Sequence, residues 1–386
     1  MRVLVVPSWY PNEFNSVSGS FFKEQVEAIA KDGVEVIVFA ISTLGLKEVV
    51  KHPIKSSLFK LKKNTINNVK TFSINVCSLG LERINKYNLL YEVLFKKYYN
   101  VIKKETGKID VIHAHSFKYA GYSCCKYISD IPIIITEHIS AIINDKLSNK
   151  DLDKLKFSIN HANKFICVSN YLKQKLVKIT KTDKDIMVIP NIVSDIFVYK
   201  DITKSDKNKF VFCSASNLVQ GKRVDVLIRA FLKAFKGNDR VILKIAGDGV
   251  EKFKLQKLII ELSLNSQVLL LGQLDRKDLL KLYEDSDAFI MVSAYETFGL
   301  VYAESLMCGL PTIGTQNGGA EDILNCYGGY LCKVNDIEDI AGKMKYVYEN
   351  YGNIDRKKIY SDTYKRLSRK VIVNKIVNIY SNVLNT

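Results

Sequence analysis

The chain has 386 residues, enough for two domains that each bury their own core. Its composition, 47% hydrophobic and 25% charged residues, is that of an ordinary globular protein and excludes a disordered or fibrous chain. The formal net charge of +17 predicts an anionic partner, which could be a nucleic acid, an anionic lipid or a phosphorylated ligand, or else it reflects a lysine-rich surface.

The distribution of basic, apolar and cysteine residues excludes several partners and locations. The basic residues are spread along the chain without a helix-turn-helix, zinc-finger or RNA-binding signature, so we expect no nucleic-acid partner. No window of about 18 apolar residues occurs, and the apolar run at 3–6 is too short for a signal-peptide core. The eight cysteines form no CxxC pair. We therefore expect a cytoplasmic protein with reduced thiols, whose only membrane contact would be peripheral.

The first half of the chain alternates between short apolar runs and amphipathic stretches. Strands are predicted at residues 3–6, 34–40, 111–112, 131–135 and 165–168. A helical period occupies residues 21–31. This alternation is typical of a parallel sheet covered by helices on both faces. The basic segment at 47–70 has no clear period, and we interpret it as a variable excursion.

A second alternation follows a polar linker at residues 194–209. Strands are predicted at 210–214, 241–245, 268–271, 288–292 and 311–313. Helices are predicted at 224–235, 252–262, 276–285 and 302–307. The fold class is therefore α/β with two doubly wound domains, in which ligands bind beyond the carboxyl ends of the strands.

The strongest local signal is a pair of carboxylates, Glu296 and Glu304, eight residues apart in the segment ETFGLVYAE. A helix starting near Gly299 would aim its free amides and positive dipole end at the strand ends, where a phosphate can bind. Glu296 would precede this helix and Glu304 would lie in its second turn, so one ligand could meet both. Two glutamates flanking a helix are also common on solvated surfaces, so the pair alone does not establish a site.

Two other loops follow predicted strands. The segment SNLVQGKR places Lys222 after Gly221 near a helix start, where a cation beside backbone amides suits a diphosphate. The segment AGDG contains Gly247 and Gly249, which permit a tight turn and the close approach of a ligand. Either loop alone is equally well explained as an ordinary turn from a strand to a helix.

The chain resembles the family 4 glycosyltransferases, of the group 1 type, in the segments SNLVQGKRVDVLIRAF, LKIAGDG, VLLLGQL, SAYETFGLVYAESLMCGLPTIGT and NGGAEDI. These segments cover most of residues 210–325. In the first half the resemblance is thinner and rests on PSWYPNEFNSVSGSFFKEQ, VIHAHS, ITEHIS and VIPNIV. The resemblance implies the GT-B fold, in which two Rossmann-like domains face each other across a cleft.

The resemblance also implies a division of labour along the chain. Residues 1–195 would form the acceptor-binding domain, and residues 196–365 would bind the nucleotide-sugar donor. Residues 366–386 would form a helix that packs back on the first domain.

By the resemblance, each motif has a role at the donor. Lys222 would hold the donor phosphates, Glu304 would hydrogen-bond the ribose hydroxyls and Glu296 would contact the transferred sugar. His138 in ITEHIS would touch the sugar near its reacting face, and Gly19 falls in a glycine loop that lies against the donor. The backbone amides that would cap the distal phosphate are those of Phe298, Gly299 and Leu300. The family uses no divalent metal and no cofactor.

The chain departs from the family at one phosphate-binding position. Many relatives carry an arginine where Asn217 stands, and that arginine shares the diphosphate with the lysine. Asn217 can donate hydrogen bonds but carries no charge. Lys222 would therefore do more of the electrostatic work, unless the neighbouring Arg223 turns toward the phosphates.

Two other patterns contain side chains that can bind metals. His113 and His115 would point the same way on a strand, but they lack a third ligand, so core packing or lining of the cleft are the other interpretations. Asp-x-Asp strings begin at Asp151, Asp183 and Asp285. None follows an apolar strand, so we interpret all three as solvated helix surface and predict no metal site.

A further candidate for partner binding is the stretch YNLLYEVLFKKYY at 87–99, which is apolar and aromatic at helical spacing with lysines nearby. It could lie on an anionic bilayer, where lipid-linked acceptors reside. A buried helix of the domain is the commoner explanation.

The resemblance implies a retaining hexosyltransferase that uses a UDP- or GDP-sugar and a glycan or polyprenyl-linked acceptor, in the assembly of bacterial surface polysaccharide such as capsule, exopolysaccharide or lipopolysaccharide. Lys222 and the helix amides would stabilise the charge on the departing diphosphate. A nucleotide-sugar epimerase or hydrolase and a non-catalytic binding protein remain alternatives. A dinucleotide oxidoreductase is excluded, because no GxGxxG follows the first strand.

Overall fold

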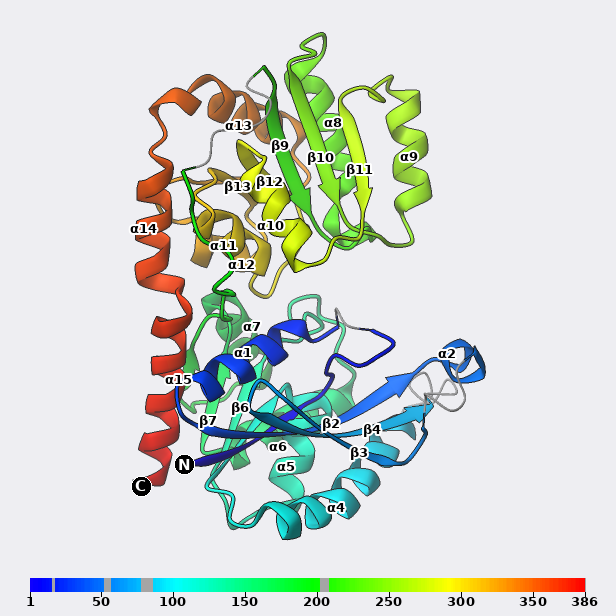
Figure 1. The fold of residues 1–386 in the computed structure, drawn as a ribbon, viewed down its shortest axis with the longest axis vertical. Coiled ribbons are helices and arrows are strands. Elements are labelled where there is room, and N and C mark those ends of the chain that lie inside the picture. Colours follow the sequence, from blue (N-terminus) through cyan, green and yellow to red (C-terminus); the bar gives the residue numbers. More distant parts are fainter. Residues whose placement is uncertain (16–17, 52–56, 78–85, 202–207, 386) are drawn as a thin grey trace. The chain divides into compact units, whose positions relative to one another are not determined.

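A computed structural model describes residues 1–15, 18–51, 57–77, 86–201 and 208–385 (Figure 1). The chain forms two compact units. The amino-terminal unit consists of Met1–Val168, Leu172–Ile192 and Ile372–Thr386. The carboxyl-terminal unit consists of Ser169–Tyr171 and Val193–Val371.

The described residues of the amino-terminal unit form an eight-stranded sheet in the order β3-β4-β2-β1-β5-β6-β7-β8. Its strands are β1 (Arg2–Pro7), β2 (Glu35–Leu44), β3 (Leu61–Ile66), β4 (Val69–Cys77), β5 (Val111–His115), β6 (Ile133–Glu137), β7 (Lys164–Cys167) and β8 (Ile186–Val188). Every pair is parallel except β3 with β4. Successive residues Val3 to Val6 of β1 are all fully buried, as expected for a strand covered on both faces.

Helices cover both faces of this sheet (Figure 1). They are α1 (Ser20–Lys31), α2 (Leu46–Lys51), α4 (Lys86–Thr106), η1 (Phe117–Gly121), α5 (Tyr122–Tyr127), α6 (Asn149–His161), α7 (Asn170–Thr180) and α15 (Arg369–Leu384). Apolar residues of α1 and α15 share one core with Val3 and Val5. On the other face, Phe95 of α4 stacks on Phe39 of β2 with ring centroids 5.7 Å apart.

The segment interpreted as a variable excursion contains regular structure. Residues 47–70 include part of α2, all of β3 and the start of β4, and β3 runs antiparallel to β4. The sequence of β3, LKKNTI, shows no apolar alternation because the first two residues of this edge strand are partly exposed and the last four are exposed.

The carboxyl-terminal unit has a six-stranded parallel sheet in the order β11-β10-β9-β12-β13-β14. Its strands are β9 (Phe210–Ala215), β10 (Val241–Ala246), β11 (Val268–Gly272), β12 (Ala288–Met291), β13 (Thr312–Thr315) and β14 (Gly329–Cys332). The strand order reverses direction between β9 and β12. In doubly wound sheets this reversal is where ligands bind, beyond the carboxyl ends of the strands.

Helices also cover both faces of the second sheet (Figure 1). They are η2 (Gln220–Lys222), α8 (Val224–Phe235), α9 (Lys252–Glu261), α10 (Arg276–Glu284), α11 (Leu300–Met307), α12 (Gly319–Leu324), α13 (Ile337–Glu349), η3 (Tyr351–Asn353) and α14 (Arg356–Leu367). Helices α8, α9 and α13 pack on one face. On the other face, Phe289 of β12 contacts Tyr283 of α10 and Tyr302 of α11 with ring centroids 5.8 and 6.1 Å apart.

The interpretation of the Asp-x-Asp strings as solvated helix surface is wrong for most of these residues. Asp151 lies in the first turn of α6 and is buried, and its carboxylate accepts a hydrogen bond from the Ser148 hydroxyl at 2.8 Å. Asp287 is buried directly before β12 and accepts from the amide of Val211 at 2.8 Å. The string that begins at Asp183 lies in a loop and not in a helix. Asp151 and Asp287 anchor the ends of elements.

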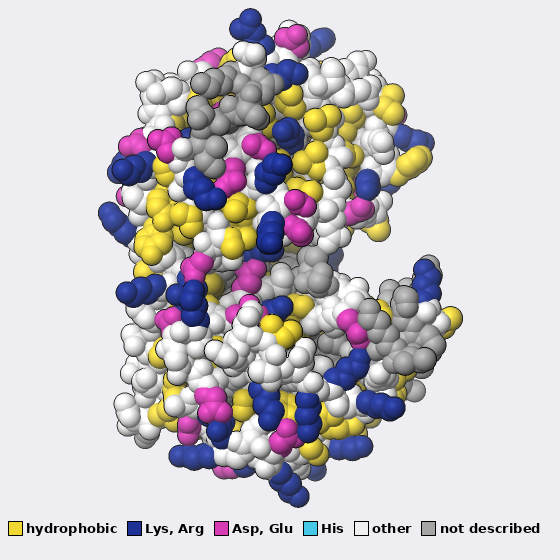
Figure 2. Space-filling model, in the orientation of Figure 1, with side chains coloured by type: hydrophobic (Ala, Val, Ile, Leu, Met, Phe, Trp, Pro, Cys, Tyr) yellow, Lys and Arg dark blue, Asp and Glu magenta, His cyan; other side chains and the backbone are white. Residues whose placement is uncertain are grey.

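Helix α4 buries the aromatic stripe that could have faced a bilayer. Tyr87, Tyr91, Phe95 and Tyr99 are all buried in the amino-terminal unit, so the explanation as a domain helix is correct for these side chains. None of the described helices is both long and apolar enough to span a membrane. Figure 2 shows basic side chains scattered over the visible surface and interspersed with acidic ones.

Candidate active site

Lys222 and Glu296 meet beside the point where the strand order of the second sheet reverses. Lys222 lies in the loop after β9, and Glu296 lies in the loop after β12. The Lys222 Nζ and Glu296 Oε1 atoms are 2.5 Å apart, and the two side chains are 24% and 12% exposed. The structure thus brings together the two side chains for which the sequence predicts contacts with the donor phosphates and the transferred sugar.

The loop after β13 holds the backbone of Glu296 in place. The Glu296 amide donates to the Asn317 carbonyl at 3.0 Å, and Glu296 forms an isolated bridge with Gly318. A Cβ atom on Gly319 would lie 2.7 Å from the backbone nitrogen of Phe298. The glycines of the NGGAEDI segment therefore allow this loop to pack directly on the segment that carries Glu296.

A second close approach fixes the turn that carries Lys222. The Ala294 amide donates to the Gly221 carbonyl at 2.8 Å, and a Cβ atom on Gly221 would lie 2.7 Å from the Tyr295 hydroxyl oxygen. The loops after β9 and β12 are thus joined through backbone contacts, which sets the spacing of Lys222 and Glu296.

The two glycines of the AGDG turn pack against neighbouring backbone. Gly247 has φ of 141°, and a Cβ atom there would lie 1.8 Å from the Ser216 carbonyl oxygen. A Cβ atom on Gly249 would lie 2.4 Å from the Leu218 carbonyl oxygen. These glycines brace the loop that carries Asn217, whose side chain is exposed. Their contact with a donor stays a prediction.

Helix α11 begins where the phosphate-binding amides are predicted. Gly299 adopts a left-handed conformation with φ of 84° before the first residue, Leu300. Tyr302 fixes the helix to the sheet, because its hydroxyl donates to the Met291 carbonyl at 2.8 Å. Amides in the first turn of a helix have no partner within the helix. The amides from Phe298 to Leu300 therefore lie at the positive end of the helix dipole, in the segment that follows Glu296.

Glu304 has two partners that the sequence did not indicate. Its Oε1 accepts from Arg276 Nη1 at 2.5 Å, and its Oε2 accepts from the Tyr283 hydroxyl at 3.3 Å. The Glu304 side chain is fully buried, whereas Arg276 is 33% exposed and lies over the Phe197 ring at 4.9 Å. A carboxylate has about four lone-pair sites, so these two hydrogen bonds do not use its whole acceptor capacity, and the contact of Glu304 with ribose hydroxyls stays a prediction. No motif connects Arg276 to Glu304.

Replacing Glu304 with alanine is expected to weaken the binding of free uridine diphosphate about tenfold or more. A hydrogen bond to a charged group contributes about 1.5–3 kcal/mol, and each 1.4 kcal/mol corresponds to about a tenfold change in affinity. Calorimetric titration with the nucleotide measures the change. Glu349→Ala, at an exposed position, is the control. A Glu304→Ala protein with a lowered unfolding temperature and unchanged nucleotide affinity would restrict Glu304 to anchoring Arg276.

Arg223 offers a second cation near the same loop. It precedes α8 with φ of 52°, a left-handed conformation that is uncommon for a residue other than glycine. Its Nε atom is buried without a hydrogen-bond partner within the described part of the chain. This unused donor makes Arg223 a second cation near the loop that carries Asn217, and its compensation for Asn217 stays a prediction.

In the amino-terminal unit, a buried carboxylate organises the backbone around His138. Glu137, at the end of β6, accepts hydrogen bonds from the amides of Phe117 at 2.8 Å and of His138 and Ile139 at 2.7 Å each. Burial raises the pKa of Glu137, although the three amide donors oppose this shift. The segment ITEHIS predicts a role for His138, but nothing in it indicates the role of Glu137.

The imidazole of His138 belongs to a buried histidine network. His138 Nε2 lies 3.1 Å from His115 Nδ1. His113 is hydrogen-bonded to Thr136 at 2.8 Å and to Tyr380 of α15 at 2.6 Å, so core packing is its role. Burial lowers the pKa of His113 and His138 to about 3, which keeps both rings neutral at pH 7. The other ring nitrogen of His138, Nδ1, is buried without a partner in the described residues.

Gly19 connects this network to the loop after β1. It precedes α1 with φ of 77°, and a Cβ atom there would lie 3.1 Å from the Trp9 carbonyl oxygen. Phe22, in the first turn of α1, contacts the ring of His138 at a centroid distance of 4.9 Å. The predicted glycine loop thus positions aromatic side chains against His138.

Clusters suited to metals are absent from the described part of the chain, where no three His, Cys, Asp or Glu side chains are grouped to hold an ion. The cysteines are free thiols, and all except Cys326 are buried. Burial raises the pKa of Cys125 and of Cys332 to about 12, so these thiols are protonated at pH 7.

The chain was compared with known proteins. The family model described as glycosyl transferases group 1 matches residues 195–366, and the model described as glycosyltransferase family 4 matches residues 19–195. N-acetyl-alpha-D-glucosaminyl L-malate synthase of Bacillus anthracis is 28% identical over 359 residues, covering 86% of this chain and 89% of the synthase. An uncharacterized glycosyltransferase of Methanocaldococcus jannaschii is 30% identical over 284 residues, covering 72% of this chain and 75% of that protein.

Solved structures share the fold over the whole chain. Sucrose-phosphate synthase from Thermosynechococcus elongatus matches with a TM-score of 0.80 at 15% identity, covering 100% of both chains. Anabaena HepE in complex with UDP-glucose matches with a TM-score of 0.69 at 17% identity, covering 99% of this chain and 100% of HepE. The predicted GT-B fold class, with two Rossmann-like domains, is confirmed. Its two sheets, its motifs and these matches identify the chain as a member of the family 4, group 1 glycosyltransferases.

Proposed function

We propose that this glycosyltransferase transfers a hexosyl-type sugar from a UDP- or GDP-sugar to a glycan or polyprenyl-linked acceptor, with retention of the anomeric configuration and without a divalent metal. The observation that carries the proposal is the contact between Lys222 and Glu296 at the reversal point of the second sheet. The UDP-glucose bound to HepE and the N-acetylglucosaminyl group named for the Bacillus relative favour a uridine diphosphate sugar. The proposed setting is the assembly of bacterial surface polysaccharide.

In the proposed reaction, the bond from the anomeric carbon to the leaving phosphate breaks, and negative charge develops on the diphosphate. Lys222 and the first amides of α11 stabilise this charge, which is the role that a metal ion has in other transferases. Glu296 orients the sugar. The acceptor hydroxyl attacks from the face that the phosphate leaves, and a phosphate oxygen takes its proton.

Product stereochemistry and chelation test the proposal together. With an α-linked donor, NMR of the product is expected to show an α linkage, because attack and departure occur on one face. Turnover is expected to survive excess chelator, because Lys222 and the helix amides supply the positive charge.

Three outcomes contradict parts of this proposal. An inverted linkage rules out the retaining mechanism, and a complete loss of turnover that manganese restores rules out metal independence. Donor consumption that yields an isomerised or free sugar with every acceptor tried would favour the epimerase or hydrolase.

We also propose peripheral contact with an anionic membrane at the cytoplasmic face, through the outward side of α4. There Leu89 and Val93 are 66% and 57% exposed, and Lys96, Lys97 and Lys104 are exposed on the same helix. Apolar side chains flanked by lysines are typical of interfacial helices. This surface differs from the aromatic stripe of α4, which lies in the core.

Sedimentation with vesicles of mixed neutral and anionic lipids tests the membrane contact. We expect binding at low salt that weakens as ionic strength rises, because salt screens exposed charges over about 10 Å at 0.1 M. Replacing Leu89 and Val93 with serine should reduce binding. The matched control replaces the exposed Val250 and Phe253 of the carboxyl-terminal unit with serine. Equal binding by wild-type and Leu89/Val93 variant proteins would contradict the role of α4.

A further inference from the structure

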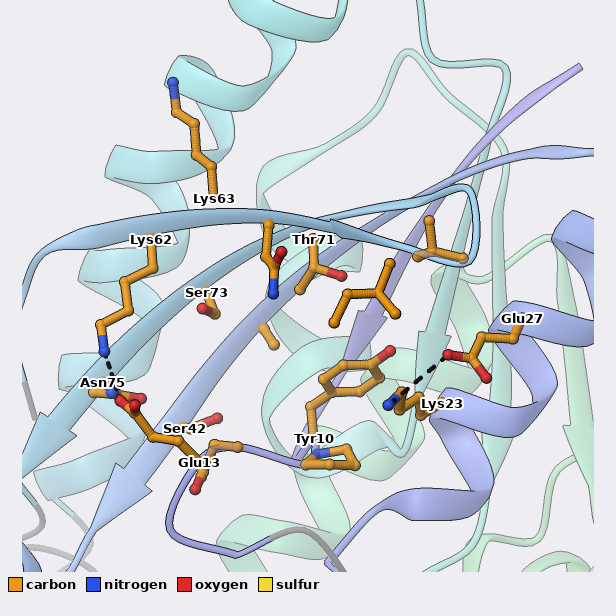
Figure 3. Close-up of a pocket in the computed structure, with 16 residues that line it drawn as sticks. Tyr10, Glu13, Lys23, Glu27, Ser42, Lys62, Lys63, Thr71, Ser73 and Asn75 are labelled. Carbon is orange, nitrogen blue, oxygen red and sulfur yellow. Dashed lines mark hydrogen bonds and ion pairs between the residues drawn. The ribbon is translucent and has the colours of Figure 1, made fainter. Parts of the chain in front are cut away.

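The amino-terminal unit contains a polar pocket with a volume of about 450 Å³ (Figure 3). It is lined by the loop after β1, by α1, by β2 and by the hairpin of β3 and β4. Its volume is within the range of about 300–1,000 Å³ that is typical of small-molecule sites. Its lining residues all belong to the amino-terminal unit, whereas Lys222 and Glu296 belong to the carboxyl-terminal unit. The hairpin that lines it has no counterpart among the predicted strands.

Small polar side chains form one wall of the pocket. Thr71, Ser73 and Asn75 alternate along β4 and therefore point to the same face, and Ser42 of β2 lies beside Asn75 in the register of the sheet. The intervening residues, such as Phe72, are fully buried on the opposite face. An inner strand of a parallel sheet usually has apolar residues on both faces. The polar face of β4 therefore indicates a surface built for a hydrogen-bonding ligand.

The charged groups facing the pocket are paired with one another. Lys62 lies 2.6 Å from Glu13, and Lys23 lies 3.9 Å from Glu27; both pairs are drawn in Figure 3. The ammonium of the next lysine, Lys63, pairs instead with Glu105 at 2.5 Å, outside the pocket lining. Two cations therefore balance two carboxylates. This lining suits an uncharged ligand better than a phosphate or a dicarboxylate.

Tyr10 adds an aromatic surface to the polar wall. Figure 3 shows its ring inside the pocket, where Ile66 and Val69 also contribute to the lining. Burial, and then the nearby Glu27 carboxylate, raise the pKa of Tyr10, so its hydroxyl keeps its proton as a hydrogen-bond donor. A pyranose ring has an apolar C–H face and a rim of hydroxyl groups. An aromatic ring opposite a row of hydroxyl and amide groups matches both parts of such a ring.

We propose that this pocket binds one uncharged saccharide unit of the acceptor, with the sugar ring against Tyr10 and its hydroxyl groups on Ser42, Thr71, Ser73 and Asn75. The assignment to the acceptor rests on the proposed glycosyl transfer, whereas the assignment to a neutral sugar rests on the pocket alone. It separates this chain from an enzyme whose acceptor is a dicarboxylate, such as the malate named for the Bacillus relative. The hairpin of β3 and β4 would then contribute to acceptor specificity.

Saturation-transfer NMR on the full chain tests the ligand class with four probes. Methyl glucoside and N-acetylglucosamine represent neutral sugars, and L-malate and inorganic phosphate represent anions. Uridine diphosphate is added in excess to occupy the donor site. We expect saccharide signals that persist under these conditions, no signal from malate, and no loss of the saccharide signals when inorganic phosphate is added as a competitor.

Two substitutions on β4 locate the binding. Ser73→Leu fills the pocket and is expected to weaken saccharide binding at least tenfold. Lys70→Leu introduces the same side chain on the opposite face of the strand and should leave saccharide binding unchanged, because Lys70 pairs with Glu105. Tyr10→Leu should weaken binding in the same direction as Ser73→Leu. Thermal unfolding of the full chain serves as the fold control, because the substituted residues lie in the amino-terminal unit and the proposed uridine diphosphate site lies in the other unit.

The outcomes separate this proposal from the proposed function. If Ser73→Leu and Lys70→Leu bind saccharides equally, or if malate or phosphate displaces them from the pocket, the inference is wrong. If saccharides bind and Ser73→Leu weakens their binding but no donor sugar is ever transferred, the saccharide pocket is supported and the proposed glycosyl transfer is contradicted. If transfer occurs and Ser73→Leu leaves the rate of transfer to neutral sugars unchanged, the proposed glycosyl transfer is supported and the assignment of the pocket to the acceptor is contradicted.

Discussion

Replacing Lys222 with alanine is expected to lower turnover about 100- to 1000-fold. A preorganised donor aimed at a developing anion typically contributes this much, and its removal leaves the departing diphosphate without its nearest cation. The effect should be at the upper end of this range because the neutral Asn217 stands where the family resemblance implies an arginine. Initial rates at saturating donor measure the loss, and thermal unfolding shows whether the variant is folded.

A surface pair provides the matched control for Lys222. Lys233 forms an ion pair with Glu338 where both side chains are about half exposed or more, so Lys233→Ala removes a lysine from a carboxylate without touching the site. Exposed pairs contribute at most about 1 kcal/mol to stability, so turnover and folding should both stay near wild type.

Arg223 determines how a weak effect of Lys222→Ala is interpreted. If the single variant keeps near-normal turnover, the double variant Lys222→Ala with Arg223→Ala decides the matter. An inactive double variant means that Arg223 supplies the charge through its unpartnered guanidinium nitrogen. An active double variant would contradict the assignment of this loop to the phosphates.

The strands of the central sheets could be predicted because burial on both faces leaves a continuous apolar run. The residues of β1 from Val3 to Val6 are all fully buried, and the predicted strand at 3–6 lies within β1. Strand β3 has no continuous apolar run. An edge strand that lines a pocket needs neither such a run nor strict alternation of polar and apolar residues. The first two residues of LKKNTI are partly exposed and the last four are exposed, and several are polar for that reason.

Those parts of the candidate site could be predicted whose backbone geometry depends on residues close together in the sequence. Gly299 marks the start of α11, and the structure places it there in a left-handed conformation. Contacts between side chains distant in sequence could not be predicted in the same way. The Arg276 and Glu304 pair depends on the approach of α10 to α11, which no spacing encodes. Glu137 stands next to His138, yet only the structure shows that its carboxylate collects three amide donors.

Replacing Glu296 with glutamine is expected to reduce turnover about 100-fold while leaving the affinity for free uridine diphosphate unchanged or slightly higher. Glutamine keeps the shape of the side chain and one oxygen acceptor, but it removes the negative charge beside the Lys222 ammonium. In this variant the Lys222 ammonium has no carboxylate partner, so the diphosphate does not compete with residue 296 for the ammonium. Turnover falls because the sugar loses a charged hydrogen-bond partner whose effect is concentrated in the transition state. Steady-state rates and calorimetric titration with the nucleotide separate the two effects.

The alternative role for Glu296 is to position Lys222, and a double-mutant cycle distinguishes the two roles. If Glu296 acts on the sugar, Glu296→Gln should lower turnover further in the Lys222→Ala background by nearly its full factor, because the two residues act on different parts of the donor. If Glu296 acts only by holding the ammonium 2.5 Å away, its substitution should cost little once Lys222 is gone. Nucleotide affinity gives an independent test, since a purely positioning role predicts that Glu296→Gln and Lys222→Ala both weaken the binding of free uridine diphosphate. A sugar contact predicts that only Lys222→Ala does so.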